Sequence, residues 1–200
     1  MPFISGAHIR NEVSVLKSRE ILISMVVIWT SFIFTQSLLP GEVSSNQSGF
    51  IVDALYPLIQ RLGINMGVDT FSFWIRKLAH FTEYFILGVL LFMTYQHRFQ
   101  TKMLLVIIFL QGLITASIDE TIQLFTPNRS GEIRDVLIDV SGVMMATIVL
   151  LIITFSDKRK AKIISRWYFG FLYMFYGCFF RQVVYFDHNV SLLYTNYNRT

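Results

Sequence analysis

Four long apolar stretches dominate this chain of 200 residues, and each is long enough to cross a lipid bilayer. They cover residues 21–39, 78–95, 103–125 and 136–155. A helix rises about 1.5 Å per residue, so roughly 17–25 apolar residues cross the hydrocarbon of a membrane. A helix also pairs its own backbone N–H and C=O groups, which find no hydrogen-bond partners in hydrocarbon. The sequence therefore predicts an all-α, polytopic membrane bundle of four transmembrane helices.

The composition excludes several other classes of protein. Charged residues make up 15% of the chain, against roughly 25% in soluble domains, so a solvated or disordered protein is excluded. The 17 Lys and Arg residues exceed the 13 Asp and Glu residues, and in so apolar a chain this excess favours phospholipid over nucleic acid. Cys178 is the one cysteine, so an internal disulfide and a cysteine metal site are both excluded.

The basic residues predict which side of the membrane each end faces. With a cytoplasmic N-terminus, ten Lys and Arg residues lie on the inner side and five in the outer connections, as the positive-inside rule favours. The first stretch has no small-residue cleavage site after it, so we expect an uncleaved span. Residues 1–20 are then a cytoplasmic flank, 21–155 a four-helix transmembrane domain, and 156–200 a basic linker with an aromatic, membrane-associated tail. Within that tail, residues 168–186 could span, re-enter or lie in the interface.

The longest connection joins the first two spans and carries its own pattern. It opens with PGEVSSNQSG, which is typical of turns and loops. Apolar residues then recur at helical intervals over residues 48–62. We expect this external segment to be an amphipathic helix on the outer leaflet or against the bundle.

Glycines inside the predicted spans indicate close helix packing. Gly88, Gly112 and Gly142 each lie in a different apolar stretch. Small residues at such positions let two helix backbones approach each other.

Ionisable residues gather at one end of the predicted bundle. A charged side chain in hydrocarbon costs about 2.5–3.5 kcal/mol, so each needs a partner or a function. Helical spacing places these groups on one face of each helix, and alternating helix directions bring them to the outer side. They are Arg76, His80, Glu83, Asp119, Asp135 and Asp139.

Three interpretations of these groups remain open. They could form a salt-bridged network that only joins helices. They could line a polar pocket in which Arg76 and Arg129 hold a phosphate or carboxylate. They could bind a divalent metal through His80, Glu83, Asp119 and Asp139. We favour the pocket, because six costly groups exceed what joining helices requires, and we assign no metal ligand. The candidate catalytic residues are His80, Glu83, Asp119, Glu120 and Asp135, and the candidate ligand-binding residues are Arg76, Lys77, Gln123, Arg129 and Asp139.

The short linker between the third and fourth spans adds a constraint. Pro127 ends a helix and Asn128 suits a tight turn, so the two spans form an antiparallel hairpin. The hairpin brings Glu120 close to Asp135. Arg129 lies where it can reach Glu120 or an external anion.

These segments resemble the VanZ-like family of bacterial membrane proteins. The match lies in RKLAHFTEYFILGVLL at residues 76–91 and DETIQLFTPNRSGEIRDVLIDVSG at residues 119–142, and FTQS at 34–37 looks like the family's first element. It covers about residues 25–155, and it departs from the family where Asp139 replaces the usual Asn. The matching residues are Lys77, His80, Phe81, Tyr84, Asp119, Glu120, Gln123, Phe125, Pro127, Arg129, Asp135 and Gly142.

The resemblance implies a location and a context. It implies a multi-pass protein of the bacterial cytoplasmic membrane, in a family whose founding member is associated with resistance to the glycopeptide teicoplanin. It implies no reaction, cofactor or oligomeric state. We expect a cell-envelope protein that binds an anionic lipid or a lipid-linked wall precursor in the phospholipid bilayer. The alternatives are an enzyme, hydrolase or transferase, acting on such a lipid, and a non-catalytic scaffold.

Overall fold

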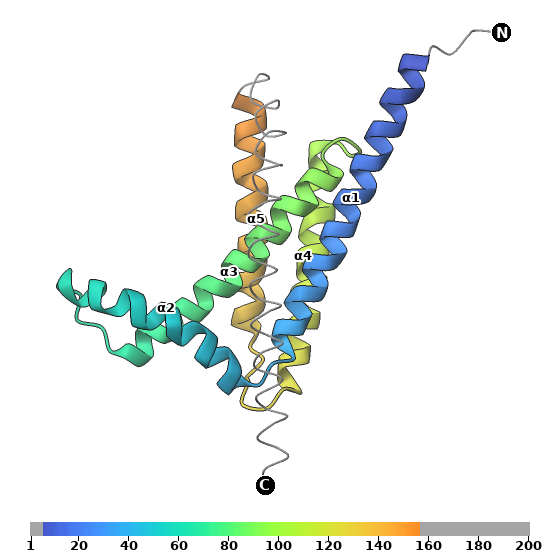
Figure 1. Cartoon of the computed structure of the whole chain (residues 1–200). Coiled ribbons are helices and arrows are strands. Elements are labelled where there is room, and N and C mark those ends of the chain that lie inside the picture. The colour runs from blue at the N-terminus through green and yellow to red at the C-terminus, as the bar shows by residue number, and fades with distance from the viewer. Residues whose placement is uncertain (1–5, 157–200) are drawn as a thin grey trace. The chain divides into compact units, whose positions relative to one another are not determined.

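The computed structural model describes residues 6–156, and this part of the chain is helical without strands, as predicted (Figure 1). The predicted aromatic segment 168–186 lies outside the described residues. Four of the helices, α1, α3, α4 and α5, are long and apolar enough to cross a membrane. The described residues up to Leu150 belong to one compact unit, which contains the packing and the site described below. The helices are α1 (Gly6–Ser37), α2 (Gly41–Arg61), α3 (Val68–Tyr95), α4 (Thr101–Leu124) and α5 (Ile133–Ser156).

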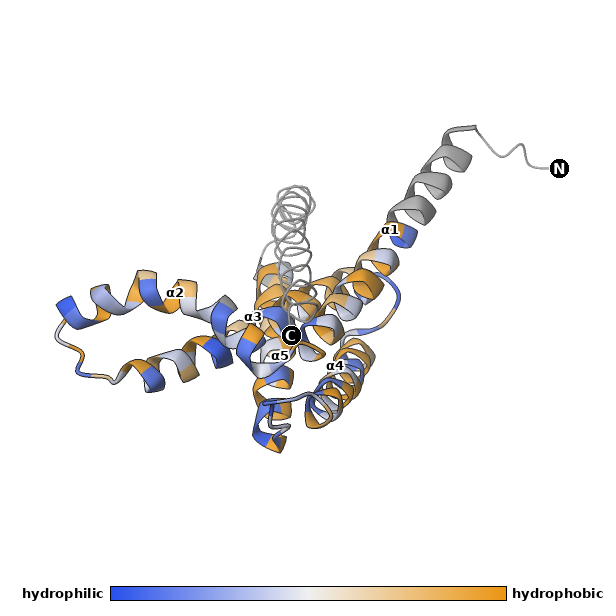
Figure 2. Ribbon diagram, turned by 60° about the horizontal axis from the view of Figure 1, so that its bottom comes forward, coloured by the Kyte–Doolittle hydropathy of each residue, from blue (hydrophilic) through white to orange (hydrophobic). Residues whose placement is uncertain are grey.

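The four long helices pack around a small buried core and turn large apolar side chains outward. The indole N–H of Trp29 in α1 donates to the backbone carbonyl of Glu83 in α3, at 2.9 Å. Figure 2 shows apolar residues along α4 and α5, and Ile114 and Met145 in these helices are more than half exposed. A soluble protein rarely leaves such surface uncovered, whereas lipid tails accept it. The completely buried side chains include Ile33, Tyr84, Leu87, Ile108, Val143 and Thr147.

Backbone-to-backbone contact holds α5 against α3 at two glycines. A β-carbon added to Gly142 would lie 2.5 Å from the Phe81 carbonyl oxygen, and one added to Gly88 would lie 2.6 Å from the Val143 carbonyl oxygen. At Gly112 in α4, the added carbon would lie 3.1 Å from the Val143 side chain. The prediction that these glycines allow close helix contact is confirmed.

The amphipathic segment is longer than predicted, and its predicted opening loop is wrong. The helix begins at Gly41 rather than near residue 48, so PGEVSSNQSG is mostly helical. Proline fits the start of a helix, and Pro40 directly precedes the first turn with φ −51° and ψ 148°. Glu42 in that turn complements the helix dipole. The Ser48 hydroxyl donates to the Ser45 carbonyl at 3.0 Å, so this polar residue is satisfied inside the helix.

The second membrane helix also begins earlier than predicted. We expected the span to start at residue 78, but α3 begins at Val68. Arg76 and Lys77 interrupt the apolar run in the sequence, although the helix continues through them. The added segment packs against α2, where the Tyr56 and Phe71 rings lie 5.7 Å apart. As a result Lys77 lies well inside the helix, about 14 Å from its start, rather than at its end.

Candidate functional site

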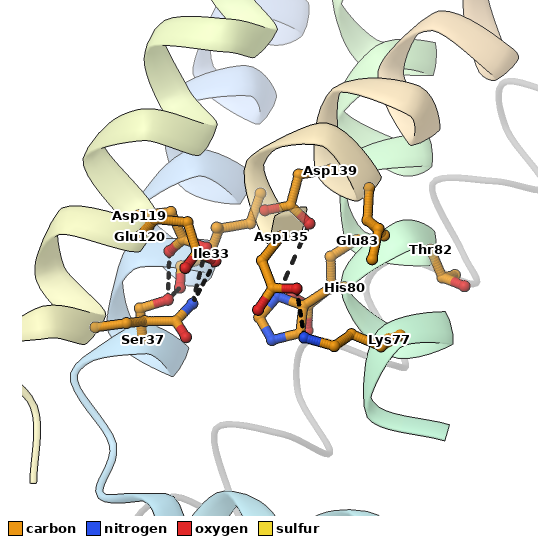
Figure 3. Close-up of polar contacts among 12 residues, drawn as sticks. Ile33, Ser37, Lys77, His80, Thr82, Glu83, Asp119, Glu120, Asp135 and Asp139 are labelled. Atoms are coloured by element: carbon orange, nitrogen blue, oxygen red, sulfur yellow. Dashed lines mark hydrogen bonds and ion pairs between the residues drawn. The ribbon is translucent and has the colours of Figure 1, made fainter. Parts of the chain in front are cut away.

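A buried polar cluster forms where the ends of α1 and α4 meet the start of α5, beside the middle of α3. Figure 3 shows His80 and Lys77 extending from α3 toward Asp139 and Asp135 of α5. Asp119 and Asp139 are 0% exposed, which is unusual for carboxyl groups. The polar cluster comprises Ser37, Lys77, His80, Asp119, Glu120, Asp135 and Asp139.

Three members of the cluster meet at its centre. One possible ligand atom from each of His80, Asp119 and Asp139 lies within 4.8 Å of the others, and we call these residues the central trio. The Nδ1 atom of His80 and the Oδ1 atom of Asp139 are 4.0 Å apart, which is too long for a hydrogen bond. Within the described residues, His80 Nδ1 and both Asp139 carboxyl oxygens are buried without a hydrogen-bond partner.

Hydrogen bonds from two helices hold the Asp119 carboxyl group in place. The Ser37 hydroxyl at the end of α1 donates a short hydrogen bond to Asp119 Oδ1. The Gln123 amide, one turn along α4, donates to Asp119 Oδ2 at 3.4 Å and to Glu120 Oε1 at 3.3 Å. Ser37 is itself fixed, because its carbonyl accepts a hydrogen bond from the Thr126 hydroxyl at 2.9 Å. These hydrogen bonds hold the Asp119 carboxyl group near the other two members of the central trio, His80 and Asp139.

An ion pair borders the central trio on the α3–α5 side. The Lys77 ammonium contacts the Asp135 carboxylate closely, and the two side chains are only 18% and 12% exposed. Each charge gives the other a partner in a region where an isolated charge is costly. The pair joins the middle of α3 to the first turn of α5.

The turn between α4 and α5 is tied to the neighbouring helices by its two charged residues. Arg129 donates to the Gln36 carbonyl at 3.0 Å and to the Leu39 carbonyl at 3.1 Å, so it satisfies carbonyls at the end of α1. Glu120 accepts a hydrogen bond from the Glu132 backbone N–H at 2.9 Å. Burial lowers the pKa of Arg129 from its ordinary value, while the nearby Asp119 carboxylate opposes that shift.

The predicted site residues converge, with differences in what each contacts. Glu120 and Asp135 lie within electrostatic range of each other, as the hairpin predicts. Arg129 contacts backbone carbonyls of α1, which the sequence did not indicate. Glu83 is half-buried and interacts electrostatically with Asp119 and Arg129, but it is not part of the central trio.

Arg76 is the exposed member of the predicted set. Its side chain makes no ion pair within residues 6–156. It lies within electrostatic range of His80 and Arg129. Arg76 is therefore the cation at this site whose charge remains available.

Two residues of the site had no predicted role. Ser37 contacts Asp119 from 82 residues away in the sequence, a separation that no local pattern reveals. The Tyr84 hydroxyl is buried beside Asp119 and makes no hydrogen bond of normal geometry within the described residues. The polar position of Ser37 just before Pro40, and the match of Tyr84 to the family pattern, were the available signals.

The fold and the buried cluster define a multi-pass membrane protein with a polar site between its helices. The family model described as VanZ/LLP1 matches residues 22–154. The chain belongs to this family. All the residues of the polar cluster lie inside the matched range. No curated protein and no solved structure shows a significant match to the chain.

Proposed function

We propose that this VanZ/LLP1 protein is a cell-envelope protein of the bacterial cytoplasmic membrane that binds an anionic lipid or lipid-linked wall precursor. Arg76, which is exposed beside the polar cluster, holds the phosphate-bearing head group from the outer leaflet, with the N-terminus in the cytoplasm. By holding such a lipid, the protein changes what teicoplanin-type glycopeptides meet at the cell surface. The observation that carries the proposal is the exposed Arg76, which has no ion-pair partner within residues 6–156.

Arg76 brings a positive charge to this region that no ion pair in the described part of the chain uses. His80 lies within electrostatic range of Arg129, Lys77 and Arg76. Lys77 has Asp135 as its partner, whereas Arg76 has no ion-pair partner in the described part of the chain. A phosphate group forms strong charge-assisted hydrogen bonds with guanidinium groups. An anion beside Arg76 would therefore complete the site.

The predicted orientation supports an outer-leaflet ligand. The cluster lies at the ends of α4 and α5 joined by the 125–132 turn, which the Lys and Arg distribution assigns to the outer side. The polar head groups of outer-leaflet lipids lie at that surface of the bilayer.

Replacing Arg76 with glutamine is expected to lower the amount of anionic lipid that co-purifies with the protein several-fold. The reason is loss of the exposed guanidinium that reaches a head-group phosphate. The measurement is mass spectrometry of lipids bound to the purified, full-length chain. Arg98→Gln is the matched control, because Arg98 is exposed beyond the opposite end of α3. Equal lipid recovery in both variants would show that Arg76 does not bind lipid specifically.

The spacing of His80 and Asp139 favours an enzyme as the second candidate function. A histidine nitrogen 4.0 Å from a buried carboxylate can tighten into a proton-handling pair when a substrate arrives. The reaction class would be hydrolysis or transfer at the head group of the bound lipid.

Lipid head groups distinguish a binding protein from an enzyme. If the protein is an enzyme, membranes from cells that express His80→Ala are expected to show a different head-group composition from membranes with the native protein. The cause would be loss of the proton-handling nitrogen. The measurement is quantitative head-group analysis, with Glu132→Gln as a control that alters a surface carboxylate near the same end of the bundle. If the head-group compositions are identical for the native protein and His80→Ala, the protein binds the lipid but does not convert it.

A further inference from the structure

The central trio brings two buried carboxyl groups together, and within the described residues neither of them forms an ion pair with a Lys or Arg side chain. Asp119 and Asp139 are both 0% exposed, and their oxygens lie within 4.8 Å of each other and of His80. Two carboxylates this close resist ionising together unless a cation joins them. Lys77 is paired with Asp135, and Arg129 donates its hydrogen bonds to backbone carbonyls rather than to a carboxyl group of the trio.

Buried atoms without partners point to a missing ligand at the same place. Both Asp139 oxygens and His80 Nδ1 lack a hydrogen-bond partner within the described residues. Buried polar groups in folded proteins are normally satisfied, so each exception needs an explanation. The Tyr84 hydroxyl, on a residue that is 0% exposed, is a further unsatisfied polar atom next to the trio and does not belong to it.

We propose that His80 Nδ1 and one carboxyl oxygen each of Asp119 and Asp139 bind a single divalent transition-metal cation, Zn²⁺ or Mn²⁺. An imidazole nitrogen suits Zn²⁺, and carboxylate oxygens suit Mn²⁺. One nitrogen with two carboxylates is unlike the all-oxygen sites of Ca²⁺ and Mg²⁺. The cation supplies the positive charge that the two buried carboxylates lack.

The spacing of the trio is compatible with one shared ion. Ligand atoms lie about 2.0–2.2 Å from Zn²⁺, so two ligands of the same ion are separated by at most about 4 Å. The His80–Asp139 separation of 4.0 Å is at that limit. All three ligand atoms lie within 4.8 Å of one another, so the side chains must close by up to about 1 Å when the ion binds.

The surroundings of Asp119 have the form of a second coordination shell. Carboxylates that bind metals are usually held by hydrogen bonds from outer residues. Ser37 and Gln123 do this for Asp119, one on each oxygen. The Tyr84 hydroxyl lies beside the same Asp119 carboxyl group.

Metal binding goes beyond the proposed lipid binding and does not depend on it. The ligand atoms are all protein side chains, so the bare cation is a sufficient probe. A failed lipid experiment on Arg76 would leave this inference untouched, because Arg76 is not a ligand.

The test uses the full-length chain, purified in detergent through an affinity tag that contains no histidine and then stripped with a chelator. Titration with Mn²⁺, followed by electron paramagnetic resonance of the free ion, and with Zn²⁺ against a chromogenic chelator should reveal one bound ion per chain. Asp139→Asn and His80→Gln should each abolish that site. Ser37→Ala should weaken binding about tenfold by freeing Asp119. Glu132→Gln, a surface carboxylate paired with Arg134, should leave it unchanged.

Thermal unfolding with and without the cation keeps the test decisive. Asp139→Asn replaces a buried carboxyl group that has no hydrogen-bond partner with an amide of the same shape, so the metal-free variant should unfold close to the midpoint of the native chain. The native chain should gain stability on adding Zn²⁺ or Mn²⁺, and Asp139→Asn should not. The inference is overturned if the stripped native chain binds no stoichiometric ion, or if Asp139→Asn and His80→Gln bind as tightly as it does. Should His80→Gln fail to fold, Asp139→Asn and Ser37→Ala still decide the result.

Discussion

Replacing Lys77 with methionine is expected to lower the free energy of unfolding by about 3 kcal/mol. Methionine preserves much of the length of the side chain but leaves the Asp135 carboxylate, whose side chain is 12% exposed, without its partner. Removing one member of a buried ion pair is costly mainly because the remaining charge stays unpaired. The measurement is reversible unfolding of the purified protein in mixed detergent micelles.

The double variant Lys77→Met with Asp135→Asn separates this explanation from a simple loss of packing. With both charges removed, no unpaired ion remains, and most of the lost stability should return. If the double variant is as unstable as Lys77→Met alone, the ion pair does not stabilise the bundle. Arg98→Met, which removes an exposed cation outside the buried core, should have little effect.

Replacing Gly142 with alanine is expected to cost about 1–3 kcal/mol of stability, as overpacking of a well-packed core does. The new methyl group would lie 2.5 Å from the Phe81 carbonyl oxygen and 3.1 Å from the Phe85 nitrogen. These are backbone atoms, so no side-chain rotation relieves the clash and α5 must move away from α3. The thermal unfolding midpoint in detergent measures the loss.

Gly49→Ala is the matched control for that substitution. Gly49 lies in α2, and an added β-carbon there meets no atom within 4 Å. Alanine favours a helix over glycine by about 1 kcal/mol, so this variant should be as stable as the native chain or slightly more so. Equal midpoints for Gly142→Ala and Gly49→Ala would contradict the close packing of α5 on α3.

The four membrane helices could be predicted because hydrocarbon imposes both a length and an apolar composition. The predicted spans 103–125 and 136–155 agree with α4 and α5 to within three residues. The starts of α2 and α3 were wrong for a shared reason. The sequence pattern is polar at residues 42–48 and charged at residues 76–77, so it did not indicate a helix there. These helical segments are stabilised by packing between α2 and α3, which a local sequence pattern does not show.

The site was predictable where helical spacing and a short turn decide position. The spacing of Asp135, Asp139 and Gly142 placed them on one face, and all three are buried. The contacts of Arg129 could not be predicted, because its partners are the Gln36 and Leu39 carbonyls, which lie at and just beyond the end of α1 and are 93 and 90 residues away in the sequence. The same holds for Ser37, because its hydroxyl reaches the Asp119 carboxyl group only when α1 and α4 pack together.

The turn between α4 and α5 is joined to the connection between α1 and α2 at several points. Gly41 donates its backbone N–H to the Pro127 carbonyl at 3.0 Å, and a β-carbon there would overlap the Asn128 carbonyl oxygen. Arg129 adds its two bonds to α1. These contacts tie the two connections together at one end of the bundle. A substitution that displaces either loop should therefore also displace the other, through these hydrogen bonds rather than through the packed helices.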